Sequence, residues 1–500
     1  MGRRWLAAVL AGVLMLGACG CATIPKNAAS GSPAPTASDD TPAPTVTLHP
    51  FTLAYNSRDS LDPYTSSGRV NHALTTLLYE GLTALDASMQ PQPQLASSVK
   101  TEGTRLTATL RADAVFSDGS AVKAEDVTAS FGRAKADETY QELLKNVASV
   151  KAEGNTLVFT LSAPDPYAAA CLSFPVVRTQ GKTTLGSGRY VFGSTPSTRL
   201  TANPHAKNAD QLPEILLSDI TDEDAMLHGL ENGTLSYYFS ELSDGSALRT
   251  GNATANVAMN ELVFLGVNSK KTALADERVR QALAQAVDRA DLASMAFSGC
   301  ARAATAPFHP LFLGEKAANV FPETENTDKA VALLREAGYN SDKGKAKTLN
   351  LTLLVNEENA FRAAAAEHVQ AQLKAAGVTV TVKSAAFSEY QSLLKKGDFD
   401  LYLGDVRLSA NMSLTPFFSG DASYGVHKGA AADAYTAFVG GEGTLDAFLA
   451  AFAADAPYIP LCWRDGAAAY DRAIPHVMPA PYDIYADIEN WGVTTAEAAS

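Results

Sequence analysis

The chain has 500 residues, a formal net charge of -14, a hydrophobic content of 46% and a mean hydropathy of -0.04. These values are typical of a soluble globular protein, and the acidic balance argues against nucleic-acid binding, which needs a basic face. The length exceeds what one hydrophobic core supports, so two or three domains are expected.

The N-terminal residues have the order of a secretory signal. Arg3 and Arg4 precede an uncharged apolar run that ends at Ala18. The run has about 14 residues, fewer than the roughly 20 that a membrane-spanning helix needs. Residues 1–18 are therefore interpreted as a signal peptide and excluded from the fold. Residues 19–45 are rich in Ala, Ser, Pro, Thr and Gly, and we expect them to form a disordered linker.

Residues 47 to about 160 mostly have the pattern of β-strands. The first strand is expected over 47–53, where Pro50 makes it an edge strand or a bent one. A stripe of leucines at helical spacing follows and is interrupted at Gly81; its members are Leu74, Leu77, Leu78 and Leu82. Further strands are expected at 104–110, 147–151 and 156–161, the last two as a hairpin.

From Glu261 onward the pattern alternates between strands and helices. One helix is expected over 277–297, and a second is expected to begin at a Thr327 cap and to end at Gly338. Three strands and two helices then alternate, at 349–355, 358–376, 378–382, 387–396 and 399–403. This β-α-β-α-β order with short connections predicts a parallel sheet with right-handed crossovers, and hence an α/β fold.

In open parallel sheets, ligands bind beyond the carboxyl ends of the strands. The segment Gly404-Asp405-Val406-Arg407 comes directly after the third predicted strand. On geometry alone, it is the best position in the chain for a loop that contacts a ligand.

Enzyme motifs fail when they are tested against the sequence. Gly181-Lys182-Thr183 resembles the end of a phosphate loop, but Val176 stands where the earlier glycine is required. There is no Gly-x-Ser-x-Gly elbow and no His-Glu-x-x-His pair, and the eight histidines are dispersed. We therefore expect a binding protein without a cofactor, a metal site or a catalytic residue.

Three cysteines remain once the signal and linker are excluded: Cys171, Cys300 and Cys462. They are far apart and odd in number, so a disulfide framework is not expected, although one bridge between two of them stays open.

The end of the apolar run, Leu16-Gly17-Ala18-Cys19, resembles the lipobox of bacterial lipoproteins. The resemblance implies cleavage before Cys19 and addition of a diacylglyceryl group to its thiol, and a two-chain anchor of this kind is stable in a membrane. Cys21 is a second candidate, and the alternative is an ordinary signal with an incidental cysteine. The implied location is the outer face of the bacterial cytoplasmic membrane, which is the periplasmic side in a Gram-negative cell.

Six segments in collinear order carry a second resemblance. They are Leu61 to Tyr64, Leu77 to Leu82, Pro93 to Ala96, Leu110 to Val127, Gly186 to Tyr190, and Asn268 with Arg278 to Arg289. They resemble bacterial extracellular solute-binding proteins of family 5, which bind oligopeptides, dipeptides and nickel. The resemblance extends from about Thr47 to Trp491.

This second resemblance implies two lobes that close on a ligand by hinge bending. Lobe I would contain residues 46–258 and 471–500, with an extra subdomain at about 76–178, and lobe II would contain residues 259–470. The hinge strands would lie around 257–264 and 459–470. The resemblance further implies a monomer, with no enzymatic activity, that delivers its ligand to an ABC permease driven by ATPase subunits.

The sequence departs from the family where a peptide's amino terminus is usually bound. Peptide binders follow the Phe-Asp-Leu strand with a Trp and then an Asp, but here the Trp is absent and Asp405 stands earlier. We expect Asp405 to pair with a ligand ammonium and Arg407 with a carboxylate; the alternative is that they satisfy the loop or each other. Trp463 with Arg464 is expected as a wall of the binding site or as interlobe packing. Tyr55 and Asn56 are weaker candidates.

The resulting hypothesis is an importer subunit that captures a small solute, with a short peptide as the leading class. A nickel chelate, an opine or a sugar is the alternative ligand. A peptide-sensing lipoprotein that signals to a partner is a different class of function. An extracytoplasmic hydrolase would need a nucleophile and base that the sequence does not show.

Overall fold

The computed structural model describes residues 46–48, 50–181, 183–193, 198–314, 319–340, 347–418, 429–474, 477–491 and 493–495. The predicted signal peptide, the linker and Cys19 lie outside these residues. Within them, no helix combines the length and the apolar character that a membrane span requires.

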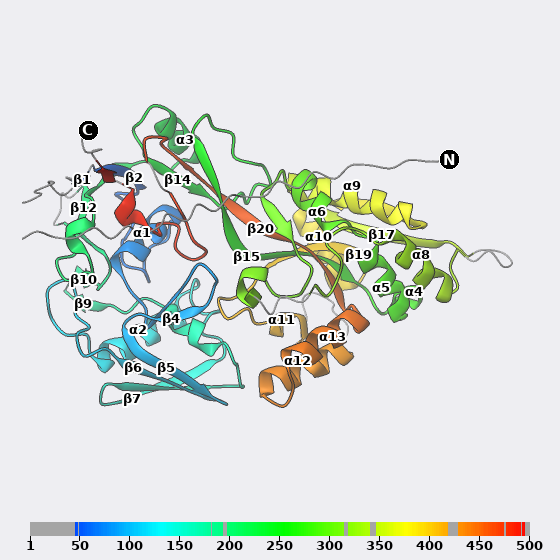
Figure 1. The fold of residues 1–500 in the computed structure, drawn as a ribbon, viewed down its shortest axis with the longest axis horizontal. Helices are drawn as coiled ribbons and strands as arrows, with labels where there is room; N and C mark the ends of the chain where they lie inside the picture. The colour runs from blue at the N-terminus through cyan, green and yellow to red at the C-terminus, as the bar shows by residue number, and fades with distance from the viewer. Residues whose placement is uncertain are drawn as a thin grey trace, which may run out of the picture. The chain divides into compact units, whose positions relative to one another are not determined.

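A seven-stranded sheet lies at the centre of residues 46–500 (Figure 1). Its order is β14 (Tyr237–Ser240), β20 (Tyr458–Tyr470), β15 (Ala253–Val267), β19 (Leu401–Arg407), β17 (Leu349–Asn356) and β18 (Val378–Ala385), with β16 (Ala301–Ala303) beside β20. β17 is parallel to both β18 and β19, which confirms the prediction from the β-α-β-α-β pattern. β15 is antiparallel to β19 on one side and to β20 on the other.

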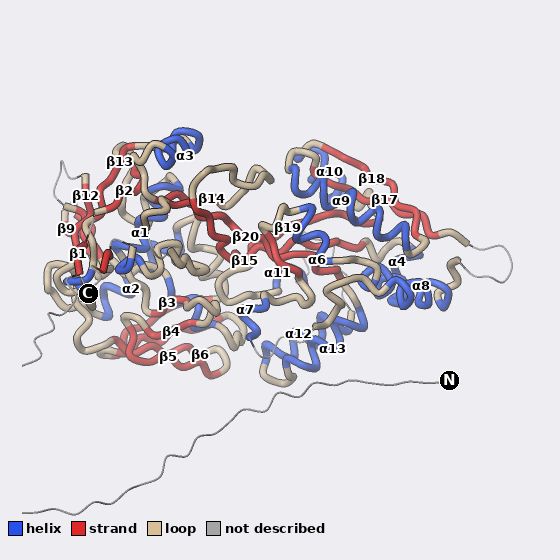
Figure 2. The backbone as a smooth tube through the Cα atoms, turned by 45° about the horizontal axis from the view of Figure 1, so that its top comes forward, coloured by secondary structure: helices blue, strands red, loops and turns tan. Residues whose placement is uncertain are grey.

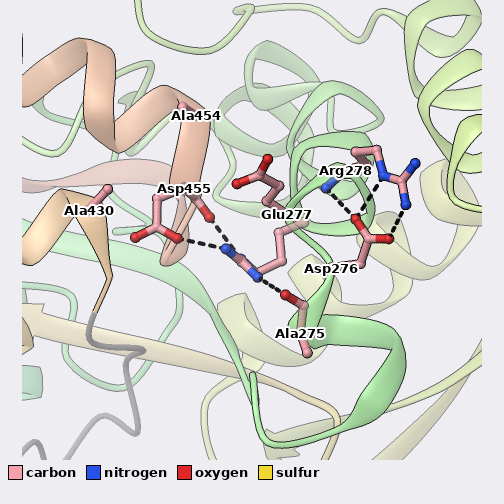
Figure 3. A pocket seen from close by; sticks show the side chains of 8 residues that line it. Ala275, Asp276, Glu277, Arg278, Ala430, Ala454 and Asp455 are labelled. Atoms are coloured by element: carbon pink, nitrogen blue, oxygen red, sulfur yellow. Dashed lines mark hydrogen bonds and ion pairs between the residues drawn. The ribbon is translucent and has the colours of Figure 1, made fainter.

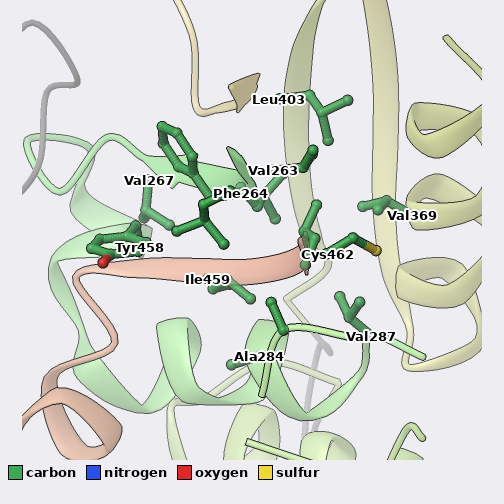
Figure 4. Packing of buried hydrophobic residues seen from close by; sticks show 14 of the residues in the cluster. Val263, Phe264, Val267, Ala284, Val287, Val369, Leu403, Tyr458, Ile459 and Cys462 are labelled. Carbon is green, nitrogen blue, oxygen red and sulfur yellow. The ribbon is translucent and has the colours of Figure 1, made fainter. Parts of the chain in front are cut away.

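Helices from residues 272–455 pack around this sheet (Figure 2). They are α4 (Thr272–Ala275), α5 (Glu277–Gln285), α6 (Arg289–Asp291), α7 (Pro310–Leu313), α8 (Thr327–Glu336), α9 (Ala360–Ala375), α10 (Phe387–Lys396), α11 (Thr415–Phe418), α12 (Ala430–Gly440) and α13 (Leu445–Asp455). Figure 4 shows their core, where Val263 of β15, Leu403 of β19 and Ile459 of β20 meet side chains of α5 and α9. α10 has the bounds predicted from the sequence because its apolar spacing and its Gly397 C-cap are both local signals.

Two helix predictions in this region are wrong in detail. The helix expected over 277–297 is broken: α5 ends at Gln285, Asp288 caps α6, and a π-helix follows over Leu292–Ala296. Arg289 turns into the core at the break, and its Nη1 donates to the carbonyls of Ala284 and Val287. The apolar spacing continues across the break, so periodicity alone could not reveal it. The cap of α8 is Asn326, not Thr327, because the Asn326 side chain accepts from the Lys329 amide.

The first part of the chain forms smaller sheets. One has the order β11 (Tyr190–Phe192), β12 (Arg199–Ala202), β13 (Ile215–Asp219), β2 (Phe51–Tyr55); another has the order β5 (Ala96–Glu102), β6 (Arg105–Leu110), β8 (Thr156–Leu161), β7 (Val147–Glu153). The two-stranded pairs are β1 (Val46–Leu48) with β21 (Val493–Thr495), β3 (Thr83–Leu85) with β4 (Pro91–Pro93), and β9 (Arg178–Gln180) with β10 (Thr183–Leu185). The helices here are α1 (Arg69–Leu78), α2 (Ala124–Ala136) and α3 (Glu223–Glu231). β2 is an edge strand, as Pro50 predicts.

The buried apolar residues fall into three large cores. One joins residues of 82–176, one joins residues of 51–79, 177–257 and 468–491, and one lies almost entirely within 258–467. Along β15, Val257 belongs to the second core and Leu262 to the third; along β20, Ala468 belongs to the second and Leu461 to the third. We keep the names lobe I, subdomain and lobe II for the ranges proposed above, and call β15 and β20 the connecting strands.

The three cysteines of the described chain, Cys171, Cys300 and Cys462, are free and buried. None of them is paired in a disulfide, so the question of a single bridge is answered for these three positions.

Gly266 and Gly404, in the third core, make room for the ring of Tyr402. This close packing gives a first prediction. A Cβ at Gly266 would overlap Cε1 of Tyr402, a ring packed edge to face against Phe264. We expect Gly266→Ala to lower the free energy of unfolding by about 1–3 kcal/mol, because the core cannot shift without strain. Urea denaturation measures the change. Gly132→Ala is the control: nothing lies within 4 Å of that position in α2, and it should gain up to about 1 kcal/mol. Equal effects at both positions would contradict the close packing.

Candidate functional site

Three charged residues stand side by side on the strands β20, β15 and β19. Glu261 of β15 is paired in register with Arg464 of β20 on one side and with Arg407 of β19 on the other. Arg464 Nη1 lies 2.6 Å from Glu261 Oε1, and Arg407 Nη2 lies 3.1 Å from Glu261 Oε2. Cross-strand neighbours of opposite charge are expected to attract, and both carboxylate oxygens are used here. We call Arg464, Glu261 and Arg407 the crossover triad.

A segment of lobe I binds to the crossover triad. Arg464 Nη2 donates to the carbonyl oxygens of Glu241 and Leu242, at 2.7 Å each. Arg407 Nη1 donates to Glu241 Oε1 at 2.9 Å. Burial alone would raise the pKa of Glu241, but the hydrogen bond and charge of Arg407, with the charges of Arg69 and Arg464, outweigh it and lower the pKa. The triad therefore holds an ionised carboxylate of lobe I.

Asp405 lies two residues before Arg407, so strand alternation places both side chains on one face of β19. Its carboxylate forms an ion pair with the guanidinium of Arg362, from the first turn of α9. The two side chains are 20% and 16% exposed, respectively. Burial raises the pKa of Asp405, and this effect exceeds the opposing charge of Arg362. α9 is capped by Asn359, whose side chain accepts from the Arg362 amide at 3.0 Å.

The sequence prediction of a loop at Gly404–Arg407 is wrong. These residues belong to β19, which pairs with β15 from Leu401 to Arg407. The β-α-β-α-β pattern could not show this, because the antiparallel partner lies far earlier in the chain. Asp405 and Arg407 do not satisfy each other: Arg362 pairs with the first, and Glu241 and Glu261 pair with the second.

Trp463 and Arg464 point to opposite faces of β20, as neighbours in a strand do. Arg464 belongs to the crossover triad, whereas Trp463 is fully buried in the core of lobe II. Its ring meets the ring of His309 edge to face, with centroids 5.1 Å apart. Burial, with the nearby charge of Arg302, lowers the pKa of His309 to about 3, so this imidazole is neutral at ordinary pH. A role for Trp463 as a wall of the binding site stays a prediction.

Tyr55 and Asn56 lie at the end of β2, in lobe I. The Tyr55 ring packs against the ring of Phe192, with centroids 5.8 Å apart. The backbone amide of Asn56 donates to Asn71 Oδ1 at 2.8 Å. These contacts remain within lobe I and do not include the crossover triad or Asp405. Their part in ligand binding also stays a prediction.

A cavity of about 540 Å³ lies elsewhere, in lobe II, and Figure 3 shows its lining. Four of its five charged side chains form two ion pairs: Arg280 Nη2 lies 2.6 Å from Asp455 Oδ1, and Arg278 Nη2 lies 2.6 Å from Asp276 Oδ2. Arg280 also donates to the carbonyls of Leu274 and Ala275. We therefore interpret these residues as a joint between α5 and α13, and not as the ligand site.

The crossover triad, Glu241, Asp405 and Arg362 together provide three guanidinium groups and three carboxylates. Such groups recognise charged ends of a ligand by paired hydrogen bonds, which suits binding. In the part of the chain that the structure describes, no group of three or more His, Cys, Asp and Glu side chains is arranged to hold a metal.

Sequence reasoning found Asp405, Arg407 and Arg464 but missed their partners. Glu261 gives a signal in retrospect, because a carboxylate inside the apolar run that forms β15 must be paired when it is buried. Arg362 follows the carboxyl end of β17, where the rule used for Asp405 applies equally. Glu241 has no comparable signal in the sequence.

Comparison with known proteins decides the family. The model described as bacterial extracellular solute-binding proteins, family 5 Middle, matches residues 90–425, more than half of the chain. The chain belongs to this family. The match confirms the family predicted from the six collinear segments.

A curated relative has low sequence identity to this chain. The glutathione-binding protein GsiB of Salmonella choleraesuis (strain SC-B67) is 26% identical over 306 residues, which cover 56% of this chain and 59% of the relative. The chain thus spans less than two thirds of the length of the curated relatives it matches.

Two solved structures show the same fold. The periplasmic murein tripeptide-binding protein MppA, in its unliganded open form, has a TM-score of 0.73 at 20% identity, over 91% of this chain and 99% of MppA. A nickel ABC transporter protein from Bacillus halodurans has a TM-score of 0.72 at 20% identity, over 88% of this chain and 98% of that protein. The family 5 chain therefore has the two-lobed α/β fold of periplasmic binding proteins, as predicted.

Proposed function

We propose that this chain is the solute-binding subunit of a bacterial ABC importer, and that it captures a short peptide between its lobes for a permease. Membership of a family of extracellular solute-binding proteins supports the binding role. GsiB, named for glutathione, and MppA, named for a murein tripeptide, support a peptide as the ligand class. The observation that carries the proposal is the largely buried ion pair of Asp405 and Arg362 beside the connecting strands.

A peptide is a zwitterion, and this ion pair offers one partner for each of its ends. The ligand ammonium would take the place of the Arg362 guanidinium at Asp405, and the ligand carboxylate would bind Arg362. The exchange replaces one ion pair by two, so no buried charge is left alone, which is the condition for charge recognition in a low dielectric. Arg407, the carboxylate partner expected from the sequence, is already held by Glu241 and Glu261. We therefore propose Arg362 for that role.

A thermal-shift screen of the full-length chain in mild detergent tests the ligand class. The set contains di-, tri- and tetrapeptides including glutathione, a nickel–histidine chelate, an opine and several sugars. A ligand at 100 times its Kd stabilises a folded protein by about 2.7 kcal/mol, which gives a clear rise in Tm. We expect peptides to raise Tm. A rise with the chelate, the opine or a sugar, and with no peptide, would contradict the peptide assignment.

We propose further that Cys19 carries the lipid anchor, with residues 19–45 as the tether. The support is the Leu16 to Cys19 segment and the linker composition. We expect Cys19→Ala to move the protein from the membrane fraction to the soluble extracytoplasmic fraction, because two acyl chains are needed for stable anchoring. Immunoblots of the fractions measure the change, with Cys21→Ala as the control. Wild-type membrane retention of Cys19→Ala would contradict the assignment.

A further inference from the structure

The tip of the β3–β4 hairpin leaves its own subdomain and enters lobe II. Met89, at this tip, is fully buried and belongs to the core of lobe II, whereas Leu82 and Leu95, at the two ends of the hairpin, belong to the core of the subdomain. Met89 has a φ of 57°, a left-handed conformation that costs a non-glycine residue roughly 1 kcal/mol or more. The hairpin tip thus holds a strained residue whose side chain packs in the other lobe.

The tip is built to hold Met89 in place. The Met89 amide donates to the Asp86 carbonyl at 2.8 Å, and Asp86 Oδ1 accepts from the amides of Ser88 and Gln90 at 2.9 Å each. Such side-chain caps fix tight turns. The geometry of the tip is therefore set within the subdomain, before any contact with lobe II.

Two further contacts join the subdomain to the short helix α7 of lobe II. Gln90 Nε2 donates to the carbonyl of Phe312 at 2.8 Å. The ring of Tyr167 meets the ring of Phe312 edge to face, with centroids 4.5 Å apart. Aromatic pairs of this geometry are favourable beyond the area they bury.

A fourth contact involves the segment that follows β19. Asn411 Nδ2 lies 2.6 Å from Asp165 Oδ2, and Asp165 Oδ1 accepts from the Tyr167 amide at 2.8 Å. Asp165 thus links Tyr167 to the stretch of chain that continues from Asp405 and Arg407. We call Met89, Gln90, Asp165 and Tyr167 the clasp.

The packing around the clasp leaves space. A cavity of about 250 Å³ is lined by hairpin and lobe II residues together: Ser88, Gln90, Tyr167, Leu311, Phe312, Leu313, Gly314 and Leu445. This hollow is partly open to solvent, so the contact between the hairpin and α7 is not close-packed over its whole surface.

We propose that the clasp holds the subdomain against lobe II and resists separation of the lobes, and thereby sets how fast a bound solute leaves. The clasp residues and their partners in lobe II lie outside the connecting strands. Hinge bending at β15 and β20 that moves the lobes apart therefore separates the clasp residues from these partners. If the solute leaves only from the open form, its dissociation rate is proportional to the open population, and loss of clasp contacts raises that rate. This kinetic role rests on the proposed function, but the role of the clasp in holding the lobes together does not.

Distances from pulsed electron–electron double resonance test, without any ligand, whether the clasp holds the subdomain and lobe II together. Spin labels at Ser98→Cys in the subdomain and Glu442→Cys in lobe II report the separation in the full-length chain with Cys19→Ala and Cys21→Ala, since the three remaining native cysteines, Cys171, Cys300 and Cys462, are buried. We expect the double variant Gln90→Ala, Tyr167→Ala to shift the distribution to longer distances with the same Tm within a few degrees. Gln90→Ala alone should shift it less, and it serves as the readout should the double variant fail to fold. Phe387→Ala, an exposed aromatic, is the control.

Stopped-flow dissociation of glutathione gives the second readout. We expect about a tenfold faster dissociation from the double variant. An unchanged distance distribution in the folded variants would overturn the clasp, whatever binds. A changed distribution with no glutathione or peptide binding by the wild type would instead support the clasp and contradict the proposed function.

Discussion

Asp405→Asn should weaken peptide binding by about 30-fold or more while leaving the fold intact. Removing one partner of a buried, hydrogen-bonded charge pair costs about 2–5 kcal/mol, and every 1.4 kcal/mol is a factor of ten in Kd. The amide keeps the shape of the side chain but loses the charge that would hold a ligand ammonium. Titration calorimetry with the peptide that gives the largest thermal shift measures the loss.

Asp398→Asn is the matched control, because that carboxylate lies near Asp405 in the sequence but is 65% exposed, with Lys383 as its partner at 3.5 Å. It should leave Kd within a factor of two. Equal affinities for Asp405→Asn and the wild type would exclude Asp405 as a ligand contact.

The same carboxylate gives binding a pH dependence of known sign. Only the ionised form of Asp405 attracts an ammonium group, and burial raises its pKa above the ordinary value of an aspartate. Affinity should therefore be complete at neutral pH and decline as the pH falls through this raised pKa. The dependence should disappear in Asp405→Asn, which has no carboxyl group to titrate.

Asp455→Ala should lower the free energy of unfolding by about 3–5 kcal/mol. Asp455 and Arg280 are 7% and 3% exposed, and truncation leaves the guanidinium buried without its counter-charge. Asp455 Oδ2 also accepts from the Ala431 amide at 3.3 Å, so the start of α12 loses a partner as well. Guanidinium chloride denaturation, followed by circular dichroism, measures the difference.

Asp276→Ala is the control from the wall of the same cavity (Figure 3). Its ion pair with Arg278 has side chains that are 28% and 45% exposed, so water screens it. Exposed pairs contribute up to about 1 kcal/mol. The Asp276 side chain also caps α5 by accepting from the Arg278 backbone amide at 3.0 Å, which adds about 1 kcal/mol, so the total loss should stay below that of Asp455→Ala. Losses of the same size in both variants would show that burial does not decide the strength of these pairs.

The regular part of lobe II is predictable because its signals are local. α9 begins at the Asn359 cap and is followed by Gly377, and α10 ends at Gly397. The short connections leave a parallel arrangement of β17, β18 and β19 as the simple solution. The break between α5 and α6 is different. It depends on Arg289, whose buried guanidinium donates to carbonyls from several segments, and no local pattern records that.

The candidate site is only half predictable for the same reason. A charged residue after a strand is visible in the sequence, which is why Asp405 and Arg407 were found. The partners of these charged residues come from distant parts of the chain: Arg407 and Glu241 are 166 residues apart, and Arg464 and Glu261, which are in register on neighbouring strands, are 203 apart. The antiparallel pairing of β15 with β19 also turned the expected loop into a strand. A single sequence gives the charges but not which of them meet.

The most direct test of the account is calorimetry of the full-length chain with one tripeptide in two forms, with a free and with an acetylated amino terminus. We predict one-to-one binding of the free form and a loss of at least 30-fold on acetylation, because Asp405 needs a ligand ammonium. Equal binding of the two forms, or binding of neither while a sugar or a metal chelate binds, would contradict it.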